Sequence, residues 1–132
     1  MTKPIVQKVV FKNATPKEIY EIYMDPKKHA ALTGGKATIE AKTGGKFSAY
    51  GGGLTGKILQ LEKNKMIVQS WRSDAFKNTD LDSTLVIQLE AKGKDTVLNM
   101  VHANVPEQDH AGVTDGWPTY YWNPIKEYLK KS

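Results

Sequence analysis

The spacing of apolar residues changes along the chain and predicts three kinds of segment. Residues 5–12 are rich in β-branched side chains that alternate or run together, which is typical of a β-strand. Between residue 37 and about residue 105, short apolar runs alternate with glycine-rich or polar breaks, which again indicates strands. In residues 112–132 the apolar positions recur at steps of three and four, which marks one face of a helix.

Two short helices are predicted between the first strand and the strand-rich region. Thr15, Pro16 and Glu18 supply a capping side chain, a proline suited to the first helical position, and the glutamate of a capping box. Asp25 and Pro26 repeat the cap and the proline, and begin a second helix that runs to about residue 32. Neither helix is long enough to persist alone, so we expect both to pack against other elements.

The strand-rich region predicts six strands joined mostly by short turns, so neighbouring strands should pair as antiparallel hairpins. The expected strands are residues 37–41, 46–50, 54–61, 65–72, 83–91 and 96–105. Residues 74–82 form the one long polar connection of this region. Alternation places Leu98, Met100 and His102 on one face of the last strand.

The C-terminal helix is predicted to be strongly aromatic on one side. Its apolar face consists of Val113, Trp117, Tyr120, Tyr121, Pro124, Ile125 and Tyr128. We expect residues 107–111 to be a polar lead-in, which would put Pro118 in the first helical turn, where proline is tolerated. Pro124 lies too far along to share that position, so a bend is predicted near Asn123 and Pro124.

This order of elements predicts an α+β fold in a single domain of residues 1–132. A curved antiparallel sheet of about six or seven strands would wrap around the long C-terminal helix, with two short helices after the first strand. Such a sheet rarely seals against one helix, so we expect a cavity between them.

Composition narrows the function. The chain is 39% hydrophobic and 25% charged, as an ordinary globular protein is, and it has no cysteine, which excludes disulfides, thiolate catalysis and cysteine-ligated zinc. Its net charge of +5 comes from scattered lysines and one arginine, unlike the arginine clusters of nucleic-acid readers. No apolar run approaches the length of a membrane span, and no metal or cofactor motif occurs. We expect a cytoplasmic protein without cofactor, nucleic-acid or membrane partners.

Several stretches resemble a known family. The residues that carry the resemblance as a set are Gly45-Lys46-Phe47, Trp71-Arg72 and Gly116-Trp117, within similar stretches that extend over residues 10–129. The sequence resembles the SRPBCC (START, Bet v 1-like) superfamily and, more narrowly, the C-terminal domain of the activator of heat-shock protein 90 ATPase. The resemblance implies the helix-grip fold, and it implies a small apolar ligand or a heat-shock protein 90 type chaperone as partner.

Two functions follow as hypotheses. In the first, the chain is a non-catalytic binding protein whose cavity takes a small apolar ligand. We expect the cavity to be lined by Tyr50, Trp71, Met100, His102, Trp117, Tyr120 and Tyr121. In the second, it is a small cyclase-type or hydrolase-type enzyme that uses His102 as its acid or base in the same cavity. No carboxylate is placed by the sequence to orient that histidine, which favours binding over catalysis.

Overall fold

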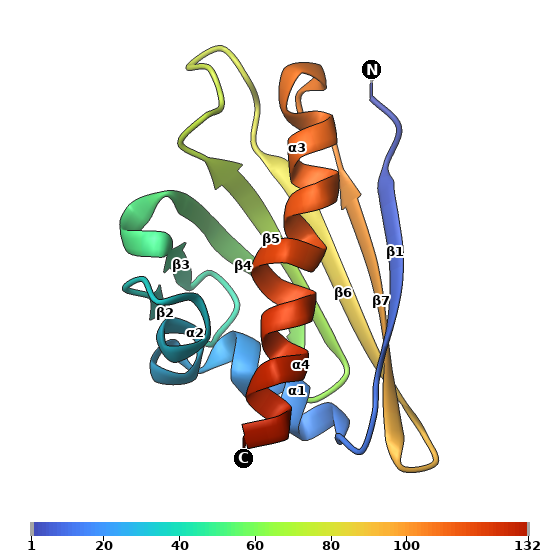
Figure 1. Cartoon of the computed structure of the whole chain (residues 1–132). Coiled ribbons are helices and arrows are strands. Elements are labelled where there is room, and N and C mark those ends of the chain that lie inside the picture. The colour runs from blue at the N-terminus through green and yellow to red at the C-terminus, as the bar shows by residue number, and fades with distance from the viewer. Residues whose placement is uncertain (1, 132) are drawn as a thin grey trace.

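The computed structural model describes residues 2–131, which form an antiparallel sheet crossed on one face by a long C-terminal helical segment (Figure 1). In this part of the chain the sheet has seven strands in the order β1-β7-β6-β5-β4-β3-β2. The strands are β1 (Ile5–Phe11), β2 (Thr38–Ile39), β3 (Lys46–Ala49), β4 (Leu54–Glu62), β5 (Met66–Ser73), β6 (Ser83–Lys92) and β7 (Asp95–Ala103). The helix-grip arrangement predicted from the sequence is confirmed.

The two short helices connect one edge strand of the sheet to the other. Helix α1 (Pro16–Met24) begins at the predicted capping box, in which Thr15 accepts from the Glu18 amide and the Glu18 side chain accepts from the Thr15 amide. Helix α2 (Pro26–Thr33) begins at Asp25, whose side chain accepts from two backbone amides, and ends at Gly34 in the left-handed conformation. Both predicted helices are therefore confirmed.

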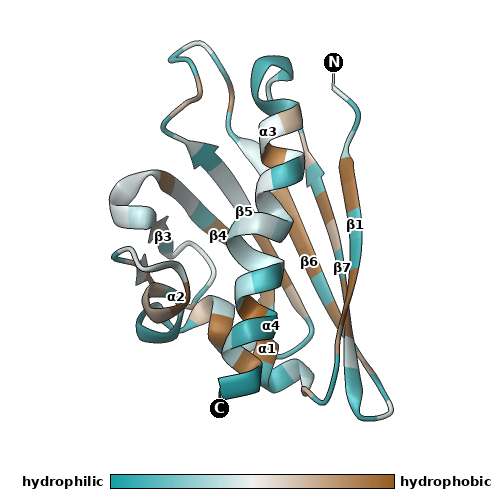
Figure 2. Ribbon diagram, viewed as in Figure 1, coloured by the Kyte–Doolittle hydropathy of each residue, from teal (hydrophilic) through white to brown (hydrophobic). Residues whose placement is uncertain are grey.

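The sheet packs one face on the core and leaves the other open to solvent. Leu85, Ile87 and Leu89 of β6 are buried, as are Leu98 and Met100 of β7. Figure 2 shows these hydrophobic strands passing behind the helix. The first of the hairpin strands is the least regular, since β2 comprises only Thr38–Ile39 instead of the predicted residues 37–41.

The C-terminal helix begins earlier than the sequence suggests. Helix α3 (Glu107–Trp117) already includes residues 107–111, so the expectation of a polar lead-in there is wrong. It continues without a break into a π-helical segment η2 (Pro118–Trp122) and then α4 (Asn123–Lys131). Pro118 therefore lies in the middle of the helical segment and not in its first turn. Residue 132, which the sequence assigns to this helix, lies outside the described residues.

The irregular turn of the C-terminal helix lies before the bend that the sequence predicts near Asn123 and Pro124. Helical backbone angles continue through Asn123, and the departure from α-helical geometry is the wide turn of η2, where the Asn123 amide donates to the Pro118 carbonyl. A proline lacks the amide that would bond the carbonyl four residues earlier. For Pro118 and Pro124 these are the carbonyls of Thr114 and Tyr120, and each accepts from a side chain instead. The Gln7 amide of β1 donates to the Thr114 carbonyl at 2.9 Å, and the Tyr50 hydroxyl donates to the Tyr120 carbonyl at 3.2 Å.

Candidate functional site

A cavity of about 590 Å³ opens between the first half of the C-terminal helix and the strands β4 and β5. It is lined by Tyr50, Gly53, Leu54, Trp71, Ser73, Asp74, Ala75, Gln108, Asp109, Gly112, Val113, Gly116, Trp117, Tyr120 and Tyr121. The wall is mostly aromatic and small side chains, with polar groups at few points, as is typical of small-molecule sites.

Helix α3 shapes the cavity through two glycines on its inner side. Gly112 and Gly116 are one helical turn apart on one face of the helix, and both line the cavity together with Trp117. A Cβ atom built on Gly112 would meet no heavy atom within 4 Å, so that position faces open space. Glycine inside a helix costs about 0.5–1 kcal/mol relative to alanine, and here it leaves room that a larger side chain would fill.

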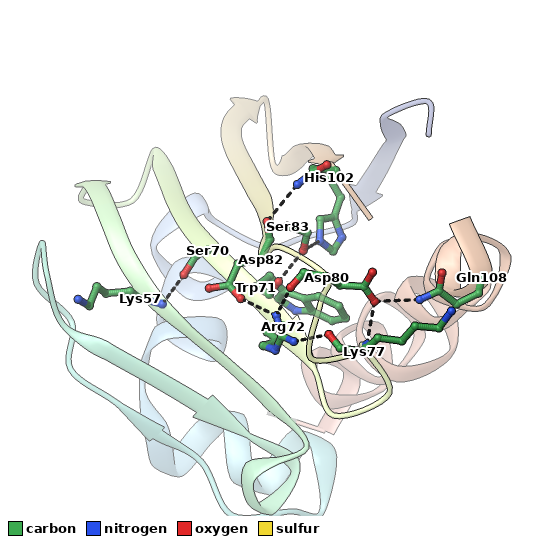
Figure 3. A network of polar contacts seen from close by, with 11 residues as sticks. Lys57, Ser70, Trp71, Arg72, Lys77, Asp80, Asp82, Ser83, His102 and Gln108 are labelled. Carbon is green, nitrogen blue, oxygen red and sulfur yellow. Dashed lines mark hydrogen bonds and ion pairs between the residues drawn. The ribbon is translucent and has the colours of Figure 1, made fainter. Parts of the chain in front are cut away.

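The connection between β5 and β6 forms the opposite wall, and Arg72 holds it in place. Arg72 donates to the backbone carbonyls of Lys77 at 2.7 Å and Asp80 at 2.9 Å, and it pairs with the Asp82 carboxylate at 3.1 Å. The Asp80 carboxylate in turn accepts from Gln108 of α3 at 2.9 Å (Figure 3). This network occupies the guanidinium, and through Asp80 it ties the later part of the loop to α3.

Tyr50 closes a further side of the cavity from the turn η1 (Tyr50–Gly52). It has a positive φ of 53°, which is uncommon for a side chain of this size. Its ring packs edge-on against Tyr120 and Tyr121, with ring centroids 6.0 and 6.2 Å apart. Tyr120 itself is 57% exposed, so it stands at the mouth and not in the core.

His102 lies in the core beside the cavity and outside its lining. The Trp117 indole N–H donates to His102 Nδ1 at 3.1 Å, so the proton of the neutral ring lies on Nε2, which donates to Ser83 Oγ at 2.8 Å. The Ser83 hydroxyl in turn donates a hydrogen bond to the Trp71 carbonyl at 2.6 Å. Burial, and then the charge of His110, lowers the pKa of His102 to about 4. With both nitrogens engaged in the core, this arrangement gives His102 a structural role.

A second buried histidine supports the other end of the aromatic wall. His29 Nδ1 donates to the Tyr23 carbonyl at 2.8 Å, and Nε2 accepts from the Tyr121 hydroxyl at 2.9 Å. The Tyr23 hydroxyl donates to buried Gln69 at 2.7 Å. Burial lowers the pKa of His29 and raises that of Tyr121. The Tyr121 ring is held at the cavity wall because its hydroxyl donates to His29 in the core.

The residues predicted to line the cavity fall into two groups. Five of them, all aromatic, line it: Tyr50, Trp71, Trp117, Tyr120 and Tyr121. Met100 and His102 share the inner face of β7 as predicted, but both are fully buried behind this lining. His102 accepts a hydrogen bond from Trp117, whose side chain lines the cavity, so His102 lies behind that side chain.

Sequence reasoning missed Asp74, Asp109 and Gly112. The two glycines four residues apart on an aromatic helical face were the available signal for Gly112, because glycine has no other reason to recur there. Asp74 lies in a loop whose path depends on Arg72, and no local pattern predicts it. Within residues 2–131 no three histidine or carboxylate side chains gather to hold a metal ion. None of the helices in that part of the chain has both the length and the apolar character needed to cross a membrane.

Comparison with known proteins gives a family. The model of the family described as activator of Hsp90 ATPase homolog 1-like protein matches residues 13–130. The chain belongs to this family. The matched residues include nearly all of the fold described above, from just after β1 to the last turn of α4.

Relatives within the activator family are longer than this chain. It is 29% identical over 113 residues to the human activator of 90 kDa heat shock protein ATPase homolog 1, covering 86% of this chain and 33% of that protein. It is 30% identical over 132 residues to a Dictyostelium discoideum activator homolog, covering 99% of this chain and 34% of that protein. The chain thus spans about a third of the length of these relatives.

A solved structure of similar size has the same fold. The crystal structure of an HSP90 activator from Plasmodium falciparum matches with a TM-score of 0.84 at 22% identity, covering 96% of each chain. At that identity the match establishes the fold. It agrees with the helix-grip architecture found here.

Proposed function

We propose that this protein is a non-catalytic binding protein that holds a small, largely apolar ligand in the cavity between its sheet and its C-terminal helix. The observation that carries the proposal is the cavity itself. Its volume of about 590 Å³ falls within the range of small-molecule sites, and five aromatic side chains line it. Aromatic walls supply a large apolar contact area with few degrees of freedom to lose.

The contacts of the two buried histidines support binding over the alternative in which His102 acts as acid or base. A general base needs a free lone pair within reach of the bound substrate. The ring nitrogens of His102 and His29 both have hydrogen-bond partners in the core, and neither histidine belongs to the lining.

The direct test fills the cavity without disturbing the fold. Gly112 lines the cavity, and a Cβ atom there meets no heavy atom within 4 Å, so Gly112→Leu places a large side chain into the cavity without a clash at its Cβ. Native mass spectrometry and thermal shift against fatty acids, sterols and aromatic polyketides should show ligands that raise the Tm of the natural chain and fail to raise that of Gly112→Leu. Asp115→Leu, an exposed change on the same helix outside the cavity lining, should bind as the natural chain does.

The cavity proposal fails if no compound in that set raises the Tm of the natural chain. It also fails if Gly112→Leu, shown to be folded by circular dichroism, binds each compound as well as the control does.

A chaperone partner is a second candidate, favoured by the family relationship. Relatives named as activators of the heat shock protein ATPase share this domain, and the Plasmodium falciparum activator is matched over 96% of its chain. We propose that this chain contacts a chaperone of that type in the cytoplasm. The chain, added to a purified heat-shock protein 90, should raise its ATPase rate or be retained in a pull-down; neither result at concentrations well above that of the chaperone would rule the contact out.

A further inference from the structure

The charges around the cavity differ in sign from those of the whole chain. The chain carries 19 basic and 14 acidic residues. Yet among the described residues, those that line the cavity include two aspartates, Asp74 and Asp109, and no lysine or arginine. Carboxylates at the cavity create a locally negative potential although the whole protein is positively charged, so the cavity favours a positively charged ligand.

The two carboxylates retain acceptor capacity. Within residues 2–131, Asp74 has a backbone hydrogen bond to Gly53, and its carboxylate has no hydrogen-bond or ion-pair partner. The Asp109 carboxylate accepts one hydrogen bond, from Gln108 at 3.1 Å, and forms no ion pair there. Because an ionised carboxylate can accept about four hydrogen bonds, both groups have free positions for a donor.

The aromatic side chains of the cavity suit a cation as well. Trp71 and Trp117 lie with ring centroids 6.1 Å apart, and Tyr50 and Tyr120 meet edge to face at 6.0 Å near the mouth. The face of an aromatic ring attracts an organic cation, most strongly for tryptophan. Aromatic rings combined with carboxylates and without basic residues are the surroundings in which proteins hold ammonium groups.

Trp71 adds an independent sign that the cavity is built for an occupant. Its side chain lines the cavity and is 6% exposed, yet its indole N–H has no hydrogen-bond partner among the described residues. A buried donor without a partner is costly, so native proteins leave few of them. A ligand atom or ring that approached this N–H would remove that cost.

We propose that the ligand of this cavity is an arylalkylamine, in which an alkyl ammonium group that is protonated at neutral pH is attached to an aromatic ring system. Its ammonium group lies toward Asp74 and Asp109, and its ring system packs against the cavity-lining surfaces of Trp71 and Trp117. This inference rests on the proposed binding function and specifies the chemical class of the ligand.

The test uses three probes of one shape and different charge: 2-(1-naphthyl)ethylamine, 2-(1-naphthyl)ethanol and 1-naphthylacetic acid. Each is titrated into the full chain while proton–nitrogen correlation spectra follow the indole N–H signals, of which that of Trp71 is assigned with a Trp71→Phe variant. The amine should bind about tenfold more tightly than the alcohol, and the acid most weakly. Added salt should reduce the advantage of the amine.

Two variants locate the source of that preference. In Asp74→Asn/Asp109→Asn the amine should lose about tenfold in affinity while the alcohol binds unchanged. Asp115→Asn removes the same kind of charge from the same helix outside the cavity lining, and should leave both affinities unchanged.

The outcomes separate the two proposals. If the amine and the alcohol bind equally, if the acid binds best, or if Asp115→Asn weakens the amine as much as the double variant does, the amine inference is overturned while the cavity still binds ligands. If none of the three probes moves the Trp71 signal, the inference and the cavity function are both overturned.

Discussion

At the scale of single residues, two buried histidines decide how the aromatic wall is held. His102 joins Trp117 to Ser83, and His29 joins Tyr121 to the backbone of α1. Each ring is neutral because burial disfavours the charged form. The two rings thereby fix the positions of the tryptophan and the tyrosine that face the cavity.

This neutrality predicts an acid-sensitive fold. The folded-state pKa of His102 is about 4, whereas an exposed histidine titrates near 6.5. Below about pH 6.5 this histidine takes up a proton in the unfolded chain but stays neutral in the folded chain. Its contribution to the free energy of unfolding is therefore fully present above about pH 6.5 and is lost progressively down to about pH 4. The loss amounts to about 3 kcal/mol in the free energy of unfolding.

Urea unfolding at several pH values between about 7 and about 4 measures this loss. His102→Gln keeps an acceptor and a donor without a titrating group, so its stability should depend less steeply on pH. The slope that remains should come partly from His29, whose pKa is lowered in the same direction. Identical slopes in the natural chain and in His102→Gln would contradict the assignment.

Residue patterns predicted the aromatic part of the site and missed its polar part. The period of three and four places Trp117 and Tyr121 on the inner face of the helix, and both are among the residues around the cavity. Periodicity gives a direction but no distance, so it could not tell that His102 lies behind Trp117. Asp74 lies in a loop that is shaped by bonds from Arg72 to the carbonyls of Lys77 and Asp80, and no hydrophobic period or turn motif predicts those bonds.

At the scale of elements, the C-terminal helix depends on side chains from elsewhere in the fold. Gln7 of β1 makes two bonds to it: its amide donates to the Thr114 carbonyl, and its oxygen accepts from the Trp122 indole at 2.7 Å. The first bond supplies the donor that Pro118 lacks. One side chain on an edge strand therefore supports both flanks of the π-helical turn.

We expect Gln7→Leu to lower the free energy of unfolding by about 1–3 kcal/mol, because it leaves a carbonyl and an indole N–H without partners. Urea midpoints measured by circular dichroism provide the value. Gln88→Leu, on the exposed face of β6, is the matched control and should change stability by less than about 0.5 kcal/mol. A Gln7→Leu variant as stable as this control would show that water replaces both bonds.

The strands and short helices were predictable because their signals are local. Capping residues, prolines and glycine turns act within a few positions, and α1, α2 and most strands begin within about two residues of the expected place. The start of the long helix was not predictable in this way. Residues 107–111 are polar and have no side-chain cap at Pro106, and they are helical because the chain continues into a segment that packs on the sheet.

At the scale of the whole molecule, one connected core joins the sheet to the helices: Trp117 is its buried member from α3 and Ile125 that from α4, and Leu32 of α2 packs against it. Phe11 of β1 contacts Trp122, Trp122 stacks on Trp117 at 5.1 Å, and Trp117 contacts Trp71 of β5. No division into independently packed parts is visible within residues 2–131. The cavity lies where α3 is least supported, beside its two glycines.

We therefore expect residues 1–132 to unfold as a single domain. Tryptophan fluorescence reports packing between helix and sheet, and far-ultraviolet circular dichroism reports secondary structure, so their urea transitions should coincide. Gly112→Ala should shift both curves together toward higher stability by about 0.5–1 kcal/mol, since it improves helix propensity in open space. Two separated transitions would contradict a single cooperative unit.

The wide turn at Pro118–Trp122 has a consequence for how the length of this chain can change. A π-helical turn is an α-helix that has absorbed one extra residue, and the flanking segments keep their rotational phase. Deleting the exposed Thr119 would convert η2 to an ordinary turn and leave the faces of α3 and α4 aligned with the sheet. Deleting Asp115 instead would rotate the remainder of the helix by about 100°, turning Ile125 toward water. The π-helical turn is therefore a place in the C-terminal helix of this chain where we expect a one-residue deletion to be accommodated without refolding the core.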